Sequence, residues 1–277
     1  MRIPDYLRLA MNSVGYNRMR SLLTSLGITV GIAAVVLLTS LGGGVQSYIL
    51  QQFTQFGAHI IAVAPGKAST LGISGAVISN VRPLTLDDAS SLEHLNGILT
   101  AVPVVQGQLP VEAGKLSRWT MILGVNHQMP QTWKMQIAQG QFLPDEAPEQ
   151  ARNLVVIGHK IKTELFPDSS PLGKRIRIGQ DRFRVIGVME KKGQILGFDM
   201  DDAVYIPVYR SMALFNRDSV MEIDMLYQGG WDEANLVKRI KKHLVRRHGG
   251  EDFTITTQSD MLGTLDSILN ILKAVVA

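Results

Sequence analysis

The sequence predicts an α+β protein with three parts: an N-terminal transmembrane helix, an α+β domain beyond the membrane, and a β-rich domain inserted into it. Three observations support this fold class. A long uncharged stretch separates Arg20 from Lys67, a strand–helix–strand pattern occurs twice, and a run of short alternating strands lies between the two occurrences. With 277 residues, 45% of them hydrophobic, the chain is long enough for one membrane element and one or two soluble domains.

The overall composition narrows the function classes only in part. A formal net charge of +4 is compatible with a nucleic-acid partner, with anionic lipid or with neither. The chain contains no cysteine, which excludes disulfide scaffolds, thiolate zinc sites and cysteine nucleophiles. An oxidising compartment is neither required nor forbidden.

The uncharged stretch from Leu22 to Leu41 predicts a membrane-spanning helix, with residues 21–43 as its bounds. About 20 helical residues rise roughly 30 Å, which matches the hydrocarbon thickness of a bilayer. A cleaved signal peptide and a buried core helix are the alternatives. The first has a shorter apolar region, of about 7 to 15 residues, and the second seldom runs this far without a charge.

Small and basic residues suggest how this helix is packed and oriented. Gly27 and Gly31 have the small-xxx-small spacing that lets membrane helices approach closely. Arg18 and Arg20 precede the helix, whereas the first basic residue after it is Lys67, so the positive-inside rule predicts a cytoplasmic N-terminus. Residues 1–20 are expected to lie on the inner membrane surface as an amphipathic segment, with a frayed tail as the alternative.

The part beyond the membrane begins with a predicted stalk helix over residues 44–57. A strand over 59–65 and a flexible Gly/Ser-rich region over 66–80 follow it. Thr85 ahead of two aspartates marks a capped helix start, and a strand over 100–107 completes the first unit. The order strand, helix, strand recurs near residues 220–257. Two such units commonly form a ferredoxin-like (split βαβ), porter-type sandwich, here over 58–107 and 218–258.

Residues 108–217 predict the inserted β-rich domain. Its clearest piece is a hairpin in which Ile176 and Ile178, then Phe183 and Val185, alternate with arginines around a turn at Gly179. At the other end of the chain, residues 259–277 predict a second stalk and the start of a second transmembrane helix. The apolar run from residue 268 covers only about half a bilayer, so we expect the chain to be part of a longer protein.

The sequence predicts no catalytic residue, no cofactor and no metal site. The sequence contains no P-loop, no G-x-S-x-G elbow and no ligand-like pairing of its six histidines. Asp199, Asp201 and Asp202 could hold a divalent cation through carboxylate oxygens, but a solvated loop is the favoured interpretation.

A basic run near the C-terminus predicts an amphipathic helix with a solvated basic face. Lys238, Lys241 and Lys242 on that face are candidate contacts for lipid phosphates. Nucleic acid is not expected as a partner, because a domain outside the cytoplasm rarely meets it.

The chain resembles the MacB/FtsX-like class of ABC transporter permeases, in particular their first transmembrane helix and periplasmic core domain. The resemblance covers nearly the whole chain and rests on four segments: "NRMRSLLTSLGITVGIAAVVLLTSLGGGVQSYILQQFTQFGAHIIAVAPG", "PLTLDDA", "ELFPDSSPLGKRIRIGQDRFRVIGVMEKKG" and "GFDMDDAVYIP". The resemblance implies a non-catalytic inner-membrane subunit that dimerises with a second permease copy. ATP hydrolysis by a cytoplasmic ATPase would move the periplasmic domain of the permease, a coupling that is termed mechanotransmission. Exporters of the class work with a periplasmic adaptor and an outer-membrane channel.

The sequence departs from some members of this class in two ways. Only about 20 residues precede the first span, so the ATPase is expected on a separate chain, and the later spans are missing. The alternative function is a singly anchored periplasmic adaptor or sensor that binds a ligand or peptide. Nothing in the sequence identifies the cargo.

Overall fold

The computed structural model describes residues 18–56, 59–66, 82–147, 150–195 and 198–264, together with Ser267. Three predictions concern residues outside these ranges: the amphipathic segment before Arg18, most of the Gly/Ser-rich region, and the apolar run from residue 268. The chain divides into two compact units, of which one comprises residues 1–50 and 262–277 and the other residues 51–261. The second is called the globular unit below.

Helix α2 (Arg18–Phe56) is one continuous helix of 39 residues. Its first part, Arg18–Leu37, is long and apolar enough to cross a bilayer, and none of it is buried. Leu22 and Leu37 are 63% and 66% exposed, unlike the apolar residues of a soluble core helix. The same helix continues through the three glycines at 42–44. The predicted span and the predicted stalk are therefore one helix, and the boundary between them stays a prediction.

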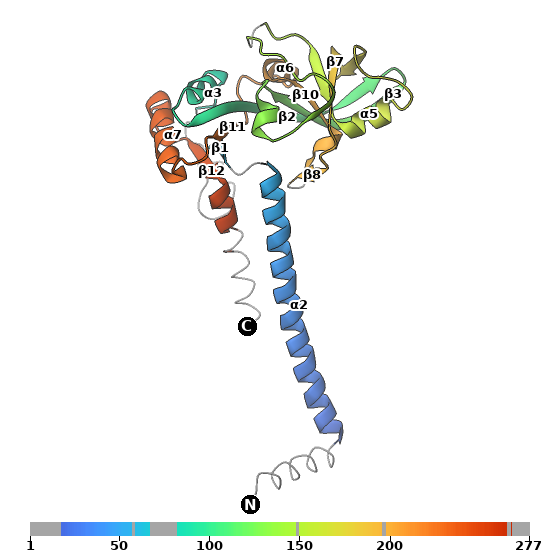
Figure 1. Ribbon diagram of the computed structural model, residues 1–277, viewed down its shortest axis with the longest axis vertical. Coiled ribbons are helices and arrows are strands. Elements are labelled where there is room, and N and C mark those ends of the chain that lie inside the picture. Colours follow the sequence, from blue (N-terminus) through green and yellow to red (C-terminus); the bar gives the residue numbers. More distant parts are fainter. Residues whose placement is uncertain are drawn as a thin grey trace, which may run out of the picture. The chain divides into compact units, whose positions relative to one another are not determined.

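Four strands and two helices form the first half of the globular unit. In chain order these are β1 (Ile60–Pro65), α3 (Leu86–Glu93), β2 (Ile98–Ala113), β11 (Glu222–Tyr227), α7 (Glu233–His248) and β12 (Phe253–Thr257). They make the two predicted strand–helix–strand units, and their strands form an antiparallel sheet in the order β12-β1-β11-β2. Helices α3 and α7 pack on one face of this sheet (Figure 1). These elements are called the helix-covered sheet below.

Local sequence explains both of these helices. The Thr85 hydroxyl accepts a hydrogen bond from the Asp88 N–H, and the Asp88 carboxylate accepts one from the Thr85 N–H, which is the capping box that the sequence predicts. Helix α7 ends at His248 and is capped by Gly249, whose φ of 82° is in the left-handed region that glycine adopts readily. Its apolar residues recur every fourth position and are buried against the sheet: Leu236, Ile240 and Leu244.

Strand β2 belongs to two sheets. It pairs with β11 as far as Val104, and from Val105 onward it pairs with β3 (Leu116–Val125). The sequence predicts that this strand ends at Gly107, just before the inserted domain. The strand instead continues to Ala113, because β3 replaces β11 as its hydrogen-bonding partner and the ladder is never interrupted.

The strands of the second half form a closed ring. From β2 and β3 the pairing passes through β10 (Ala203–Pro207), β5 (Leu154–Ile157), β7 (Asp181–Met189) and β6 (Arg175–Ile178), and β6 pairs with β2 again. This six-stranded ring is called the barrel below, and the short strand β4 (Ile137–Gly140) extends it at β7. The β6–β7 hairpin confirms the predicted one. Its Ile176 and Ile178 are buried, while Arg175 and Arg177 are exposed.

The barrel interior is filled with apolar side chains from all six strands and from α5 (His159–Leu165). Ile122, Ile157, Ile161, Ile178 and Phe183 are among the most buried of them. A further apolar core covers the outer side of the barrel and reaches the face of the sheet opposite α3 and α7. Short elements complete the globular unit: α4 (Met129–Thr132), β8 (Gln194–Ile195), β9 (Phe198–Asp199), η2 (Met200–Asp202) and α6 (Val208–Leu214).

Candidate functional site

The predicted membrane-packing glycines lie on an open face of α2. Gly27 and Gly31 are one turn apart, and a Cβ built on either would meet no atom within 4 Å outside the neighbouring helix backbone. Such a strip lets another helix approach closely. Binding of a partner helix there stays a prediction.

The predicted topology determinants, Arg18 and Arg20, lie in the first turn of α2. The Thr24 hydroxyl donates a hydrogen bond to the Arg20 carbonyl and the Thr29 hydroxyl donates one to the Ser25 carbonyl, each at 2.8 Å. These hydroxyls are thus satisfied by the helix's own backbone, which lowers the cost of placing them in a bilayer. The orientation itself stays a prediction.

The three candidate lipid contacts lie on the exposed side of α7. Lys238, Lys241 and Lys242 are exposed, opposite the buried apolar residues, so the predicted amphipathic helix is confirmed. Lys241 forms an ion pair with Glu251 at 2.7 Å. Lipid contact stays a prediction.

The acidic cluster is not the solvated loop that the sequence favours. Asp201 is buried, and its carboxylate oxygens accept hydrogen bonds from the backbone N–H groups of Lys192 and Gly193 at 2.8 and 3.1 Å. Asp199 caps η2 by accepting a hydrogen bond from the Asp201 N–H. The prediction of solvation is wrong for Asp201, because its carboxylate satisfies backbone donors of the preceding turn.

Asp202, the third member of the cluster, is neutralised by two cations. Arg118 binds its carboxylate with two nitrogens, Lys160 lies 3.3 Å away, and the Thr120 hydroxyl donates to it. Burial alone would raise the pKa of Asp202, but the hydrogen bonds from Arg118 and Thr120 outweigh burial and lower it. Within the described ranges, no three His, Asp or Glu side chains converge as metal ligands would.

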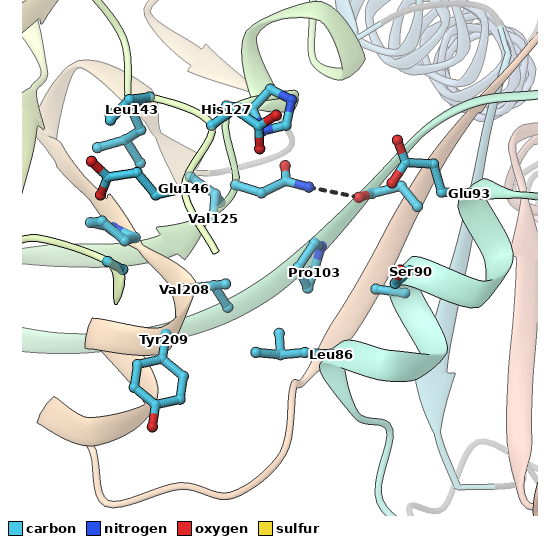
Figure 2. Close-up of a pocket in the computed structure, with 17 residues that line it drawn as sticks. Leu86, Ser90, Glu93, Pro103, Val125, His127, Leu143, Glu146, Val208 and Tyr209 are labelled. Carbon is cyan, nitrogen blue, oxygen red and sulfur yellow. Dashed lines mark hydrogen bonds and ion pairs between the residues drawn. The ribbon is translucent and has the colours of Figure 1, made fainter. Parts of the chain in front are cut away.

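A cavity of about 240 Å³ lies between the helix-covered sheet and the barrel. Figure 2 shows three groups of lining residues, which come from α3, from the end of β3 and the segment after it, and from the start of α6. The lining combines apolar and polar side chains, among them Leu86, Ser90, Glu93, Pro103, Val125, His127, Leu143, Glu146, Val208 and Tyr209. No sequence motif marks this cavity, because its lining comes from five separate stretches of chain, within residues 86–93, 101–103, 125–127, 143–151 and 207–209.

Amide side chains fasten the two halves beside the cavity. Gln128 donates a hydrogen bond to Glu93 and accepts one from the Ala101 N–H at 3.1 Å. The Asn126 amide donates to the Ala101 carbonyl at 2.8 Å. The segment that follows β3 is therefore bound to both α3 and β2.

Acidic groups dominate the charge of the lining. Asp145 lies 3.1 Å from His127, and Glu146 forms an ion pair with Arg152. The hydrogen bonds from Arg152 lower the pKa of Glu146. Glu93 is the remaining carboxylate of the lining, and the Gln128 amide is the partner that the structure gives it.

A second buried contact joins the two halves on the opposite face of the sheet. Trp133, which follows α4, donates its Nε1–H to the carboxylate of Asp224 on β11 at 2.8 Å. Burial raises the pKa of Asp224 to about 8, the negative charge of Glu222 adds to this rise, and the Trp133 hydrogen bond opposes it. Thr100 and Thr132 share a buried hydrogen bond of 2.7 Å beside this contact.

A buried ionic cluster ties the ends of α3, α7 and β12 together. The side chain of His248 is fully buried, with Nε2 at 3.3 Å from Asp88 and Nδ1 at 2.8 Å from Asp252. Arg247 also donates to Asp88 at 2.7 Å. Burial alone would raise the pKa of Asp88, but the hydrogen bonds from Arg247, Thr85 and His248 outweigh it and lower the pKa. No local sequence pattern predicts this cluster, because Asp88 and His248 lie 160 residues apart in the chain.

These features define a class: a mixed α/β globular unit of helix-covered sheet and barrel that follows an apolar helix able to span a membrane. Residues 21–243 match the family described as MacB-like periplasmic core domain. The chain belongs to this family, which confirms the resemblance found in the sequence.

Relatives and solved structures agree with this membership. The chain is 27% identical over 270 residues to the "Macrolide export ATP-binding/permease protein MacB" of Marinobacter nauticus and 31% identical over 258 residues to the protein of the same name in Vibrio parahaemolyticus. It covers 41% and 39% of their lengths. The periplasmic region of MacB from Actinobacillus actinomycetemcomitans has the same fold, with a TM-score of 0.66 and 21% identity over 79% of this chain and 98% of that one.

Proposed function

We propose that the chain is the N-terminal portion of a permease subunit in a MacB/FtsX-like ABC exporter. In this proposal α2 crosses the inner membrane with its N-terminus in the cytoplasm, and the globular unit lies in the periplasm. A separate cytoplasmic ATPase hydrolyses ATP and a second permease copy completes the dimer, together with a periplasmic adaptor and an outer-membrane channel. The family membership and the names of the relatives, which combine export, ATP binding and permease, support this assignment.

The observation that carries the proposal is how the globular unit is connected to the helices. Helix α2 leads into β1, and the helical residues 258–264 follow β12 directly. β1 and β12 are antiparallel neighbours, with Ile61 opposite Thr257, so both connections reach the same end of the same two strands. A displacement of the two helices would therefore act on one strand pair, as mechanotransmission requires.

The domain assignment belongs to the same proposal. The antiparallel order β12-β1-β11-β2 with two helices on one face supports a ferredoxin-like, porter-type domain over 58–107 and 218–258. The barrel supports an inserted β-rich domain over 108–217. Residues 1–20, 21–43, 44–57 and 259–277 would be the cytoplasmic segment, first span, first stalk, and second stalk with the start of the second span. Lys238, Lys241 and Lys242 would contact lipid phosphates.

Single cysteines test the topology, because the chain has none of its own. Ser117→Cys places a thiol on the exposed hairpin of the barrel. We expect a membrane-impermeant maleimide to label it in intact spheroplasts, and labelling only after lysis would refute the periplasmic placement. Co-purification in mild detergent with the ATPase encoded beside the permease tests the coupling, and failure of the two to associate would favour the singly anchored adaptor or sensor.

A further inference from the structure

The cavity at the junction is lined by both polar and apolar side chains, and both kinds come from each side of it. Ser90 and Glu93 lie one turn apart on α3, on the same side as Leu86 (Figure 2). Facing them are Val125 and Leu143, which belong to the apolar core of the barrel's outer side. Such a cavity suits a ligand with one charged or polar end and one apolar end.

The charge of the lining sets the sign of that polar end. None of the 17 lining residues is Lys or Arg, although the chain carries a formal net charge of +4. Three lining residues are carboxylates, of which Asp145 and Glu146 have cationic or titratable partners. Among the residues that the structure describes, no basic side chain forms an ion pair with Glu93, which receives the Gln128 amide instead. A cation entering the cavity would supply the missing partner.

The size of the cavity limits what can enter. Its volume of about 240 Å³ is below the roughly 300–1,000 Å³ of sites for drug-sized ligands. It accommodates a group comparable to a single long side chain. A large amphiphile could place only one arm in it.

We infer that this cavity binds a guanidinium or ammonium group carried on a short apolar stem. The cationic head pairs with Glu93 beside Gln128, and the stem lies against Leu86, Val125 and Leu143. A free small amine or an Arg or Lys side chain of a polypeptide supplies the same chemistry. Because the walls come from both halves of the globular unit, an occupant stabilises the arrangement in which the two halves are joined.

Charge-selective modification of a cavity cysteine tests the inference in the full chain, reconstituted in lipid nanodiscs. Ser90→Cys lines the cavity and Ser117→Cys, exposed on the barrel hairpin, is the control. Each variant reacts with cationic aminoethyl methanethiosulfonate and with its anionic sulfonatoethyl analogue. Side chains three residues apart on a helix are about 6 Å apart, so an uncompensated Glu93 should raise the cation-to-anion rate ratio about fivefold to tenfold over the control. Adding Glu93→Gln should return the ratio to that of the control.

Protection by ligand separates the two sources of the cation. Agmatine serves as the free cation and acetyl-Ala-Arg-Ala-amide as the peptide, each up to about 10 mM, with butylurea as the neutral analogue. Protection of Ser90→Cys by agmatine alone assigns a free small cation, and protection by the peptide at lower concentration assigns a polypeptide side chain. Equal rate ratios at the two cysteines, or protection by neither cation, would overturn the inference. Unchanged thermal unfolding of Glu93→Gln shows that the variant is folded.

Discussion

Replacing Asp224 by asparagine tests whether this carboxyl keeps its proton at neutral pH. Asp224 is 9% exposed on β11, and its carboxylate accepts the Trp133 N–H at 2.8 Å. Burial raises its pKa to about 8, with a further contribution from Glu222. Asparagine has the same shape and is neutral at every pH, and its carbonyl oxygen can still accept from Trp133.

The sign and the size of the effect follow from the two pKa values of Asp224. Its pKa is about 4 in the unfolded chain and about 8 in the folded one, so the native state holds the extra proton between these pH values. The stabilisation by protonated Asp224 is full below about pH 4 and is lost progressively as the pH rises to about 8. Three pH units from 4 to 7, at roughly 1.4 kcal/mol each, amount to about 4 kcal/mol.

Denaturant unfolding of the full chain in detergent, followed by near-ultraviolet circular dichroism from pH 4 to pH 8, measures this difference. We expect Asp224→Asn to match the unmodified protein near pH 4 and to be more stable by up to about 4 kcal/mol at pH 7. Glu222→Gln is the companion variant, because removing the neighbouring charge should lower the pKa of Asp224 and reduce the difference. A difference between Asp224→Asn and the unmodified protein that is the same at every pH would refute the reasoning.

Three further predictions use the same unfolding assay. Asp88→Asn should cost about 2–4 kcal/mol at pH 7, because Arg247 loses its anionic partner and His248 keeps only Asp252. The loss should shrink as the pH falls below about 4, since the pKa of Asp88 is lowered by folding, and a pH-independent loss would contradict this. Gly97→Ala should cost about 1–3 kcal/mol, because Gly97 has a φ of 98° and a Cβ there would lie 2.9 Å from the Trp231 ring. Gly250→Ala, which has open space around it, is the control. Equal losses of stability in the two variants would argue against backbone and steric strain at Gly97. Ile240→Ala should cost about 2–5 kcal/mol, because it leaves a cavity in the core of the helix-covered sheet. The exposed Lys242→Ala on the same helix should cost less than about 0.5 kcal/mol. A similar loss in both variants would show that α7 is not held by its apolar face.

Features that depend on residues close together in the chain could be predicted from the sequence. The period of four in α7, the alternation of Ile176 and Ile178 with arginines, and the Thr85 cap each depend on neighbours a few residues away, and the structure confirms all three. The uncharged stretch likewise identified α2, because length and apolar composition alone decide whether a helix can span a bilayer.

Features that bring together distant stretches of chain could not be predicted from the sequence. The strand end predicted at Gly107 lies six residues before the observed end of β2 at Ala113, because nothing local shows that β3 takes over from β11 as its partner. The cavity brings α3 next to residues that follow β3 and β10, and the Asp88 cluster brings together residues about 160 apart in the chain. Asp224 lies in an otherwise ordinary strand pattern, and its hydrogen-bond partner Trp133 comes from the other half, 91 residues away in the chain.

Strand β2 determines how a movement of the helix-covered sheet would reach the barrel. β2 is continuous from Ile98 to Ala113, so its first half moves with β11 while its second half forms part of the closed ring. A closed, tightly packed ring deforms little, and the barrel would therefore follow β2 as one body. Relative motion of the two halves would then be concentrated where side chains rather than strands join them, at the Gln128–Glu93 and Trp133–Asp224 contacts. The first contact borders the cavity, and burial raises the pKa of the Asp224 carboxyl in the second to about 8, so a bound cation and the protonation of Asp224 would each act on this joint.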